Sequence, residues 1–267
     1  MKALYNIYYL MGQMFVTVLS FFLFKKKTAF ISNFIKLLRH KSEILVTLNI
    51  GPKFYVRSFN DLMVIRQVFS DKVYKSLFTD LKEEATFLDI GAYIGDSVIY
   101  ASRYAKIKKI IAVEPVPDNL KFLRKNLKEN EIANVVVYEK AIAPDSKGRN
   151  IYIFPDETRA SFTNSHGSCG KVFVPTVTLN ELVALAKTKL VLMKCDIEGG
   201  EYELILRSSL ETLSRINRIM IELHLINLKD KKILSKVLSH LEKSGFICKI
   251  KKSFFNPNYP LLYGFRQ

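Results

Sequence analysis

Acidic side chains and one histidine stand at the ends of apolar segments beyond residue 85 of this 267-residue chain. They are Asp89, Glu114, Glu139, Asp196, Glu198, Glu222 and His224. Carboxylates can accept hydrogen bonds from ribose hydroxyls, remove a proton from a reacting hydroxyl or bind a hard metal ion, and an imidazole can act as a base near neutral pH. One polar strand end is ordinary, because the chain leaves the core there. Five consecutive segments that each end in a carboxylate indicate a shared site.

The elements that must position these residues alternate along the chain. Strand-like segments at 86–90, 109–115, 134–142, 189–199 and 217–224 alternate with helical segments at 96–107, 118–130, 178–186, 201–213 and 230–243, and two further strands are predicted near 245–252 and 261–266. We expect Asp118 to cap its helix. This alternation predicts an α/β fold with a mostly parallel sheet and helices on both faces. Ligands of such sheets bind at the carboxyl ends of the strands, where the acidic residues fall.

A glycine-rich turn, DIGAYIGD at 89–96, follows the first of these strands. It matches neither the dinucleotide fingerprint nor the phosphate-binding loop of nucleotide hydrolases. Glu114 ends the next strand, where its carboxylate can accept both hydroxyl hydrogens of a ribose. The pair predicts a nucleoside-containing ligand without a pyrophosphate.

The segments FLDIGAYIGD, EPVPDNLKFLRKN, TVTLNEL, KCDIEGGE and IELH occur in this order between residues 86 and 225. In order and spacing they resemble the FkbM-type S-adenosylmethionine-dependent methyltransferases. The resemblance implies a class I methyltransferase (Rossmann-like) fold, a mostly parallel seven-stranded sheet with one antiparallel strand. It also implies S-adenosylmethionine as cofactor and, as is usual in this family, methylation of a hydroxyl oxygen on a sugar, lipid or natural product.

The resemblance also implies roles for individual residues. Asp89, Gly91 and Gly95 would line the methionine end of the cofactor, and Glu114 would hold the ribose. The predicted cofactor-binding set also includes Tyr93, Asp96, Pro115 and Glu139. Asp196 and Glu198 would face the reacting centre. Tyr93 departs from the family pattern, which has Gly or Asn at this position. A bulky residue tolerates positive φ poorly, which predicts a different turn or a different hold on the cofactor.

Methyl transfer to an alcohol needs a base for the hydroxyl proton. We expect His224 in that role, with Asp196 or Glu198 orienting it or acting in its place. In an alternative arrangement Asp196, Glu222 and His224, with Glu198 nearby, hold a divalent cation that lowers the pKa of the acceptor. The metal-free reaction is the preferred prediction.

A formal net charge of +16 raises the question of nucleic acid. The middle third is nearly balanced in charge, and no RNA-binding appendage or amide-methylation tetrapeptide is recognisable, which argues against a nucleic-acid partner. We therefore predict a glycan, lipid or other small hydroxyl acceptor. The alternatives are an RNA methyltransferase and a non-catalytic binding module that keeps the methyltransferase fold. Three cysteines without paired spacing predict a reducing compartment.

Three regions are predicted: a hydrophobic helix at 1–27, an accessory flank at 28–85 and the methyltransferase domain at 86–267. No charged residue occurs from 3 to 24, so this segment could span a membrane, lie in its interface or dock on protein. Lys25, Lys26 and Lys27 place the rest of the chain on the cytoplasmic side, free or attached to the membrane face. In the flank we expect a hairpin of strands at 44–50 and 53–59, then a helix capped by Asn60 or Asp61.

Residues 143–177 form the longest interruption between core elements. Loops of this length beside a site are usually functional. IYIF and KVFV are expected to pair as a hairpin that leaves Ser161, Asn164, Ser165 and His166 near the cofactor or acceptor. His166 and Cys169 do not make a zinc site and are expected to be ordinary loop residues. This excursion, the flank and the tail after residue 253 would supply the pocket walls.

Overall fold

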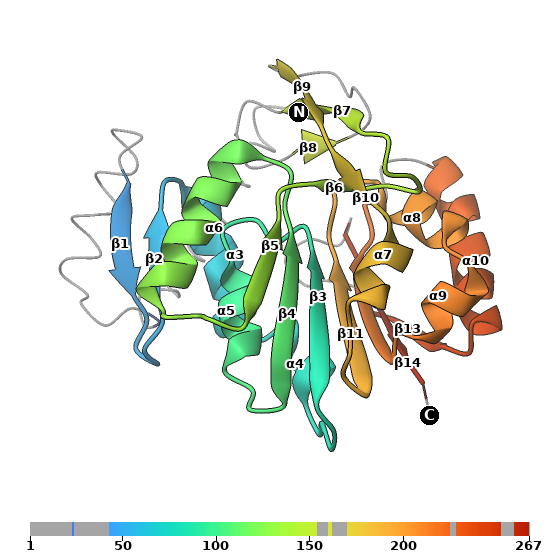
Figure 1. Ribbon diagram of the computed structural model, residues 1–267, viewed down its shortest axis with the longest axis horizontal. Helices are drawn as coiled ribbons and strands as arrows, with labels where there is room; N and C mark the ends of the chain where they lie inside the picture. Colours follow the sequence, from blue (N-terminus) through green and yellow to red (C-terminus); the bar gives the residue numbers. More distant parts are fainter. Residues whose placement is uncertain are drawn as a thin grey trace, which may run out of the picture.

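A seven-stranded sheet forms the centre of the computed structural model, which describes Leu23 and residues 43–153, 160–161, 170–224, 228–251 and 259–266. Its strands are β3 (Ala85–Ile90), β4 (Ile107–Val113), β5 (Val135–Tyr138), β11 (Leu190–Cys195), β12 (Arg218–Glu222), β13 (Ile247–Lys251) and β14 (Leu261–Phe265). Their spatial order is β13-β14-β12-β11-β3-β4-β5 (Figure 1). The strands β5, β4, β3, β11 and β12 pair in parallel, and β14 is antiparallel to β12 and to β13. This order, with one reversed strand, is the class I methyltransferase arrangement, so the predicted α/β fold is confirmed.

The central strands are apolar because both faces of the sheet are covered. All six residues of β3 are buried. Successive side chains of a strand point to opposite faces, and Phe87 and Leu88 accordingly belong to two different hydrophobic clusters. The first cluster is shared with α3 (Phe59–Phe69), α4 (Lys75–Phe78), α5 (Asp96–Ser102) and α6 (Pro117–Glu129), the second with α7 (Leu179–Ala184), α8 (Glu201–Arg207), α9 (Leu210–Ser214) and α10 (Leu228–Lys243). Burial of each large apolar side chain contributes about 1.5–3 kcal/mol.

Two predicted helix caps are wrong. Helix α3 is capped by Ser58, whose hydroxyl accepts from the Asp61 N–H, while the Asp61 carboxylate accepts from the Ser58 N–H in a reciprocal capping box. Asp61 is therefore the third helical residue. Helix α6 begins one residue before Asp118, at Pro117, because proline already has the φ that the first helical position requires.

Two predicted elements are divided. The helix expected at 201–213 breaks between α8 and α9, where Ser209 is extended and its hydroxyl accepts from the Thr212 N–H to begin α9. The strand expected at 134–142 ends at Tyr138. It continues as β6 (Ala141–Ile142), which leaves the central sheet and pairs in parallel with β10 (Thr176–Val177).

The predicted hairpin of the flank is confirmed as β1 (Ile44–Thr47) and β2 (Lys53–Val56), paired antiparallel. Its side chains Phe54 and Val56 are fully buried in the first cluster, together with residues of α3 and α4. The Asn126 side chain of α6 also bonds the Tyr55 N–H. The flank thus contributes side chains to the same hydrophobic core as the central sheet, whereas an accessory layer would only cover that core.

The excursion also forms the predicted hairpin. β7 (Arg149–Ile153) pairs antiparallel with β9 (Gly170–Val174), and β8 (Ala160–Ser161) adds a short third strand. Figure 1 shows these strands at the top of the molecule, above the carboxyl ends of the central strands. The predicted loop residues Asn164, Ser165, His166 and Cys169 lie outside the described residues.

Among the described residues, no helix is long and apolar enough to cross a bilayer. The predicted hydrophobic segment 3–24 lies outside them except for Leu23. The Leu23 carbonyl accepts from the Asn49 N–H at 2.8 Å, and its side chain packs against the first cluster.

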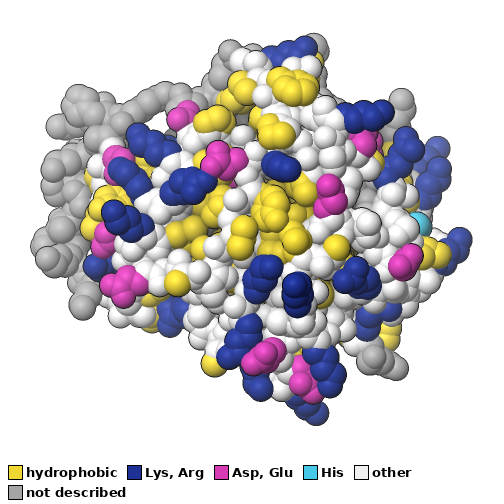
Figure 2. Space-filling model, in the orientation of Figure 1, with side chains coloured by type: hydrophobic (Ala, Val, Ile, Leu, Met, Phe, Trp, Pro, Cys, Tyr) yellow, Lys and Arg dark blue, Asp and Glu magenta, His cyan; other side chains and the backbone are white. Residues whose placement is uncertain are grey.

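Figure 2 shows hydrophobic side chains gathered at the centre of one face, with Lys and Arg below them. The exposed Val136 of β5 is 45% accessible.

Candidate functional site

The two glycines of the turn after β3 are required by close contacts within the protein. Gly91 has φ of +81°, and a Cβ there would collide with the carbonyl oxygen of Asp196. Gly95 has φ of +89°, and its Cβ would lie 2.7 Å from Leu123 of α6. Only glycine combines positive φ with such approaches. The turn therefore lies directly against the loop that follows β11. This brings the predicted cofactor-binding turn next to the loop that carries Asp196 and Glu198.

Tyr93 occupies the middle of this turn with φ of +49°, so the positive φ is retained despite the bulky side chain. Its N–H donates to Glu114 Oε2 at 2.9 Å, and its hydroxyl donates to the carboxylate of Asp61 in α3. Strained backbone persists where surrounding contacts hold it. The flank therefore supplies a partner for the residue that departs from the family pattern.

Glu114 follows β4 and is 4% exposed. Its Oε1 accepts from the Val116 N–H at 2.9 Å and from the Asn119 side chain at 3.1 Å, while Oε2 accepts from the Tyr93 N–H. Burial raises the pKa of this carboxyl to about 7, against the opposing effect of these three donors. With these donors from the described part of the chain, one lone pair of Oε2 remains for a further donor.

A closed series of polar contacts links Glu114 to the flank. Asn119, which donates to Glu114, accepts from the guanidinium of Arg57. The Arg57 N–H donates to Asp61 at 2.7 Å, and Asp61 accepts from the Tyr93 hydroxyl. Tyr93 in turn donates to Glu114. The ribose-binding candidate is thus held in place by residues up to 57 positions away from it in sequence.

Lys194 is the buried cation of the site. It lies on β11 directly beside Asp89 of β3 in the sheet register, and its Nζ is 3.3 Å from Asp89 Oδ1 and 3.9 Å from Asp196 Oδ2. The same Nζ donates to the Gly91 carbonyl. Burial disfavours its charge, but Asp89 and the neighbouring acidic groups outweigh this and hold the pKa of Lys194 well above its usual value. Lys194 therefore joins both loops of the site.

The structure places Asp89 and Asp96 beneath the turn. Asp89 is completely buried, accepts from the Ser97 hydroxyl and pairs with Lys194. Asp96 begins α5, and burial raises its pKa to about 7. Asp89 is held by these two partners and Asp96 is buried at the start of α5, and the contact of either carboxylate with a cofactor stays a prediction.

The predicted catalytic residues do come together. His224 Nε2 is 3.8 Å from Asp196 Oδ1 and 3.5 Å from Glu198 Oε2. Its Nδ1 forms a 2.7 Å bond with Glu201 Oε1. Glu201 is 1% exposed, whereas the side chains of Asp196 and Glu198 are 27% and 28% exposed. The loop after β11 thus presents two accessible carboxylates in front of a buried histidine.

The electrostatics of this cluster change the role predicted for His224. Burial disfavours the imidazolium, but Glu201, Asp196 and Glu198 outweigh it and raise the pKa of His224 to about 10. A protonated imidazole cannot accept the hydroxyl proton. In this state His224 can act only as a hydrogen-bond donor towards the neighbouring carboxylates.

Glu222 and two tyrosines surround the cluster. Burial, followed by the charge of Asp196, raises the pKa of Glu222 to about 8. Tyr74 of the flank is buried, and the Lys194 Nζ lies 5.9 Å from the centre of its ring. The Tyr259 ring lies 4.8 Å from the imidazole of His224. The flank and the tail therefore both reach the site, as expected of pocket walls.

The remaining predicted residues lie around this centre. Pro115 is partly buried beside Glu114. Glu139 stands after β5 with a half-exposed side chain that pairs with Arg124 of α6. The Ser161 hydroxyl of the excursion donates to the Glu198 carbonyl at 3.0 Å, which attaches the excursion to the loop after β11.

Sequence reasoning missed Lys194, Glu201, Arg57, Asp61 and Tyr74. A lysine inside the apolar run LVLMKCD was a readable signal for Lys194, since a buried charge needs a partner. The others become visible only when the flank and α8 are placed in three dimensions.

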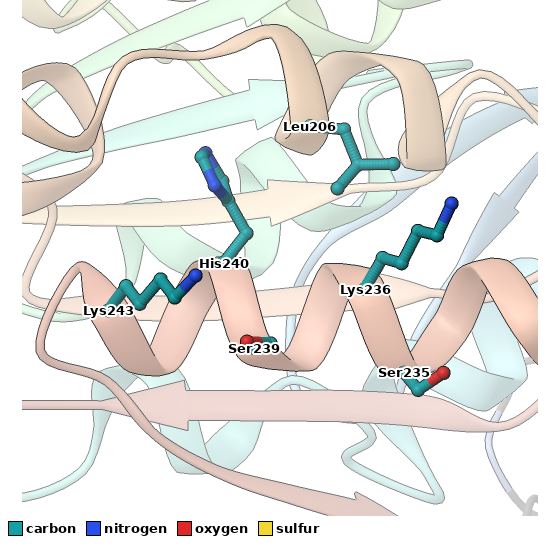
Figure 3. A pocket seen from close by; sticks show the side chains of 6 residues that line it. All are labelled: Leu206, Ser235, Lys236, Ser239, His240 and Lys243. Atoms are coloured by element: carbon teal, nitrogen blue, oxygen red, sulfur yellow. The ribbon is translucent and has the colours of Figure 1, made fainter.

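A surface pocket of about 330 Å³ lies elsewhere, between α8 and α10. Figure 3 shows its lining, Leu206 and five polar or charged residues of α10. None of these residues belongs to the site described above. The carboxylate cluster is therefore the stronger candidate for catalysis.

The comparisons with known proteins agree with the sequence motifs. The model of the methyltransferase FkbM domain matches residues 89–248, more than half of the chain. No match was found among curated proteins. Among solved structures, methyltransferase FkbM from Methylobacillus flagellatus KT is 16% identical with a TM-score of 0.48, covering 78% of this chain and 52% of that one.

Two further solved structures are similar. Precorrin-6y C5,15-methyltransferase from Geobacter metallireducens is 19% identical with a TM-score of 0.44, covering 73% of this chain and 88% of that one. A putative methyltransferase from Streptococcus mutans, in complex with SAH, is 11% identical with a TM-score of 0.45, covering 73% and 97%. The match to the family model includes the glycine turn, Glu114 and the whole carboxylate cluster, and the chain belongs to the FkbM methyltransferase domain family.

Proposed function

We propose that this chain is an S-adenosylmethionine-dependent O-methyltransferase acting on a hydroxyl of a glycan, a lipid or another small acceptor. The observation that carries the proposal is the convergence of the Glu114 loop, the glycine turn and the Asp196 loop at one sheet edge, inside the matched family domain. This edge is where ligands of such folds bind.

The residues present fit the cofactor. Among the described residues, Glu114 Oε2 has one lone pair left for a ribose hydroxyl, and the position of the carboxylate is fixed by Tyr93, Val116 and Asn119. The known chains of similar fold include one with SAH bound. When bound, S-adenosylmethionine supplies an activated methyl group on a sulfonium.

The protein's own contribution is positioning and proton removal. The acceptor oxygen must be held in line with the methyl–sulfur bond, and the partly exposed side chains of Asp196 and Glu198 can reach it. The cofactor would supply the methyl group to the acceptor oxygen and leave as SAH, and Asp196 or Glu198 would take the hydroxyl proton. The imidazolium of His224, fixed by Glu201, keeps that carboxylate in place.

The test is a transfer assay with methyl-labelled S-adenosylmethionine and separate pools of glycans, membrane lipids and RNA. We expect label in a glycan or lipid fraction that survives mild alkali, because ether-linked methyl groups resist hydrolysis and methyl esters do not. Asp196→Asn should lower the rate at least tenfold, and the surface variant Glu129→Gln should leave it unchanged. Label that is sensitive to ribonuclease would favour an RNA methyltransferase. Cofactor binding without transfer to any pool would favour a binding module.

A further inference from the structure

The imidazole of His224 is held as metal-ligating histidines are held. Its Nδ1 bonds the buried Glu201 carboxylate at 2.7 Å. A carboxylate on one ring nitrogen fixes the tautomer and directs the other nitrogen outward, and most metal-bound histidines have such a partner. In His224 the outward nitrogen is Nε2, which faces the catalytic loop.

Two carboxylates face that nitrogen at separations longer than ordinary hydrogen bonds. Nε2 is 3.8 Å from Asp196 Oδ1 and 3.5 Å from Glu198 Oε2. Donors that share one ion at about 2.0–2.2 Å lie about 3.0–3.5 Å from each other. Both carboxylates belong to partly exposed side chains, and a small movement of either one towards Nε2 would bring that pair of atoms to the separation expected of two donors on one ion.

Two further observations support a cation site. Glu201 Oε2 is buried and has no hydrogen-bond partner among the described residues. Ligand atoms of Asp196, Glu201 and His224 also lie within 4.8 Å of one another. Neither Glu222 nor Glu198 is part of that group. Glu198 is included instead because its Oε2 lies 3.5 Å from Nε2, so the arrangement differs from the predicted set of Asp196, Glu222 and His224.

The charge balance points the same way. Asp196, Glu198, Glu201 and Glu222 surround His224, and Lys194, which lies beside Asp196, is also paired with Asp89. A bound divalent cation would neutralise this excess of negative charge.

We propose that Asp196, Glu198 and Nε2 of His224 bind a divalent transition metal, with Glu201 as the outer carboxylate that orients the histidine. The ion would replace the proton on Nε2, which passes to solvent, so that the imidazolium of the metal-free chain becomes a neutral ligand. Mixed imidazole and carboxylate donors suit Mn²⁺ or Zn²⁺ better than Mg²⁺. The partly exposed side of the ion would be open to an acceptor hydroxyl and would lower its pKa. That catalytic role rests on the proposed function, whereas metal binding itself does not.

The experiment is a titration of the metal-stripped full chain with MnCl₂, following free Mn²⁺ by electron paramagnetic resonance, and with ZnCl₂ by calorimetry. We expect one ion per chain with a dissociation constant below 100 µM, as an order of magnitude. Asp196→Asn and Glu198→Gln should each weaken binding at least tenfold, and Glu129→Gln should not change it. Both loop variants alter partly exposed side chains, so the fold, checked by thermal melting, should be preserved.

The proposal is overturned if the folded wild-type chain binds neither ion at 1 mM, or if both loop variants bind as well as the wild type. A parallel titration with S-adenosylmethionine in the presence of EDTA separates the two hypotheses. Cofactor binding without metal binding would refute the metal site alone. Loss of cofactor binding with the metal retained would refute the proposed function alone.

Discussion

Replacing Lys194 by methionine should destabilise the protein strongly. The side chain is about 95% buried, and its Nζ lies 3.3 Å from the completely buried Asp89. At an effective dielectric constant of about 20, this separation corresponds to roughly 5 kcal/mol of attraction. Removing one partner of a buried pair typically costs about 3–5 kcal/mol, because the other charge is left without compensation. For a chain of this size that loss lowers the melting temperature by about 6–20 °C.

The assay is thermal unfolding of Lys194→Met beside the control Lys125→Met. Lys125 forms an exposed ion pair with Glu43, and loss of such a pair costs about 1 kcal/mol or less. A double variant, Lys194→Met with Asp89→Asn, should recover part of the lost stability, since it removes both charges. The reasoning is refuted if Lys194→Met melts within 2 °C of the wild type, or if the double variant is less stable than the single one.

Three other changes test the loops around the site. Tyr93→Phe should lower the free energy of unfolding by about 1.5–3 kcal/mol, because the buried Asp61 carboxylate loses a hydrogen-bond donor. In a double-mutant cycle measured by urea unfolding, the same change should cost less in the Asp61→Asn background. Gly91→Ala should lower the free energy of unfolding by more than 2 kcal/mol, because the new Cβ collides with a carbonyl oxygen. The control Gly51→Ala, also at positive φ but in open space, should lower it by about 1 kcal/mol. Equal losses in the two variants would contradict the close approach at Gly91. The affinity for S-adenosylmethionine should fall about tenfold per pH unit below pH 7 and be constant above pH 8, because ribose binding needs ionised Glu114, whose pKa of about 7 lies above its ordinary 4.5. An affinity for S-adenosylmethionine that does not change between pH 5.5 and 8 would show that Glu114 does not bind the ribose. Because the pKa of Glu114 is raised in the folded chain, its contribution to the stability of the unliganded chain is greatest below pH 4.5 and is lost as the pH rises through 7.

Much of the fold was predictable because its signals are local. Apolar strands that end in acids predicted the parallel sheet and the edge where the acidic residues gather, and the resemblance predicted one antiparallel strand but not its position. The helix breaks were harder to predict, since Ser208 and Ser209 interrupt a segment whose apolar spacing continues into α9. The end of β5 at Tyr138 was also hard to predict, because the chain continues as β6, which pairs with β10, 35 residues later in the sequence.

The residues of the site could be predicted in part, but the hydrogen bonds and ion pairs that hold them could not. Asp196, Glu198 and His224 follow neighbouring strands, so their meeting could be inferred from topology. Glu201 follows Asp196 by only one turn of loop, yet its role depends on α8 directing it behind His224. Arg57 and Asp61 act through the Tyr93 turn, which joins regions separated by more than 30 residues. Such long-range contacts leave no periodic pattern in one sequence.

Calorimetric titration of the full chain with S-adenosylmethionine and SAH tests the central claim most directly. The account predicts micromolar binding by the wild type, as an order of magnitude, and at least tenfold weaker binding by Glu114→Gln, because a charged hydrogen bond to the ribose is worth about 1.5–3 kcal/mol. Glu129→Gln, a carboxylate variant at a surface ion pair, should bind like the wild type. A folded wild-type protein that gives no binding heat and no thermal shift with either ligand, or a Glu114→Gln variant that binds as tightly as the wild type, would contradict it.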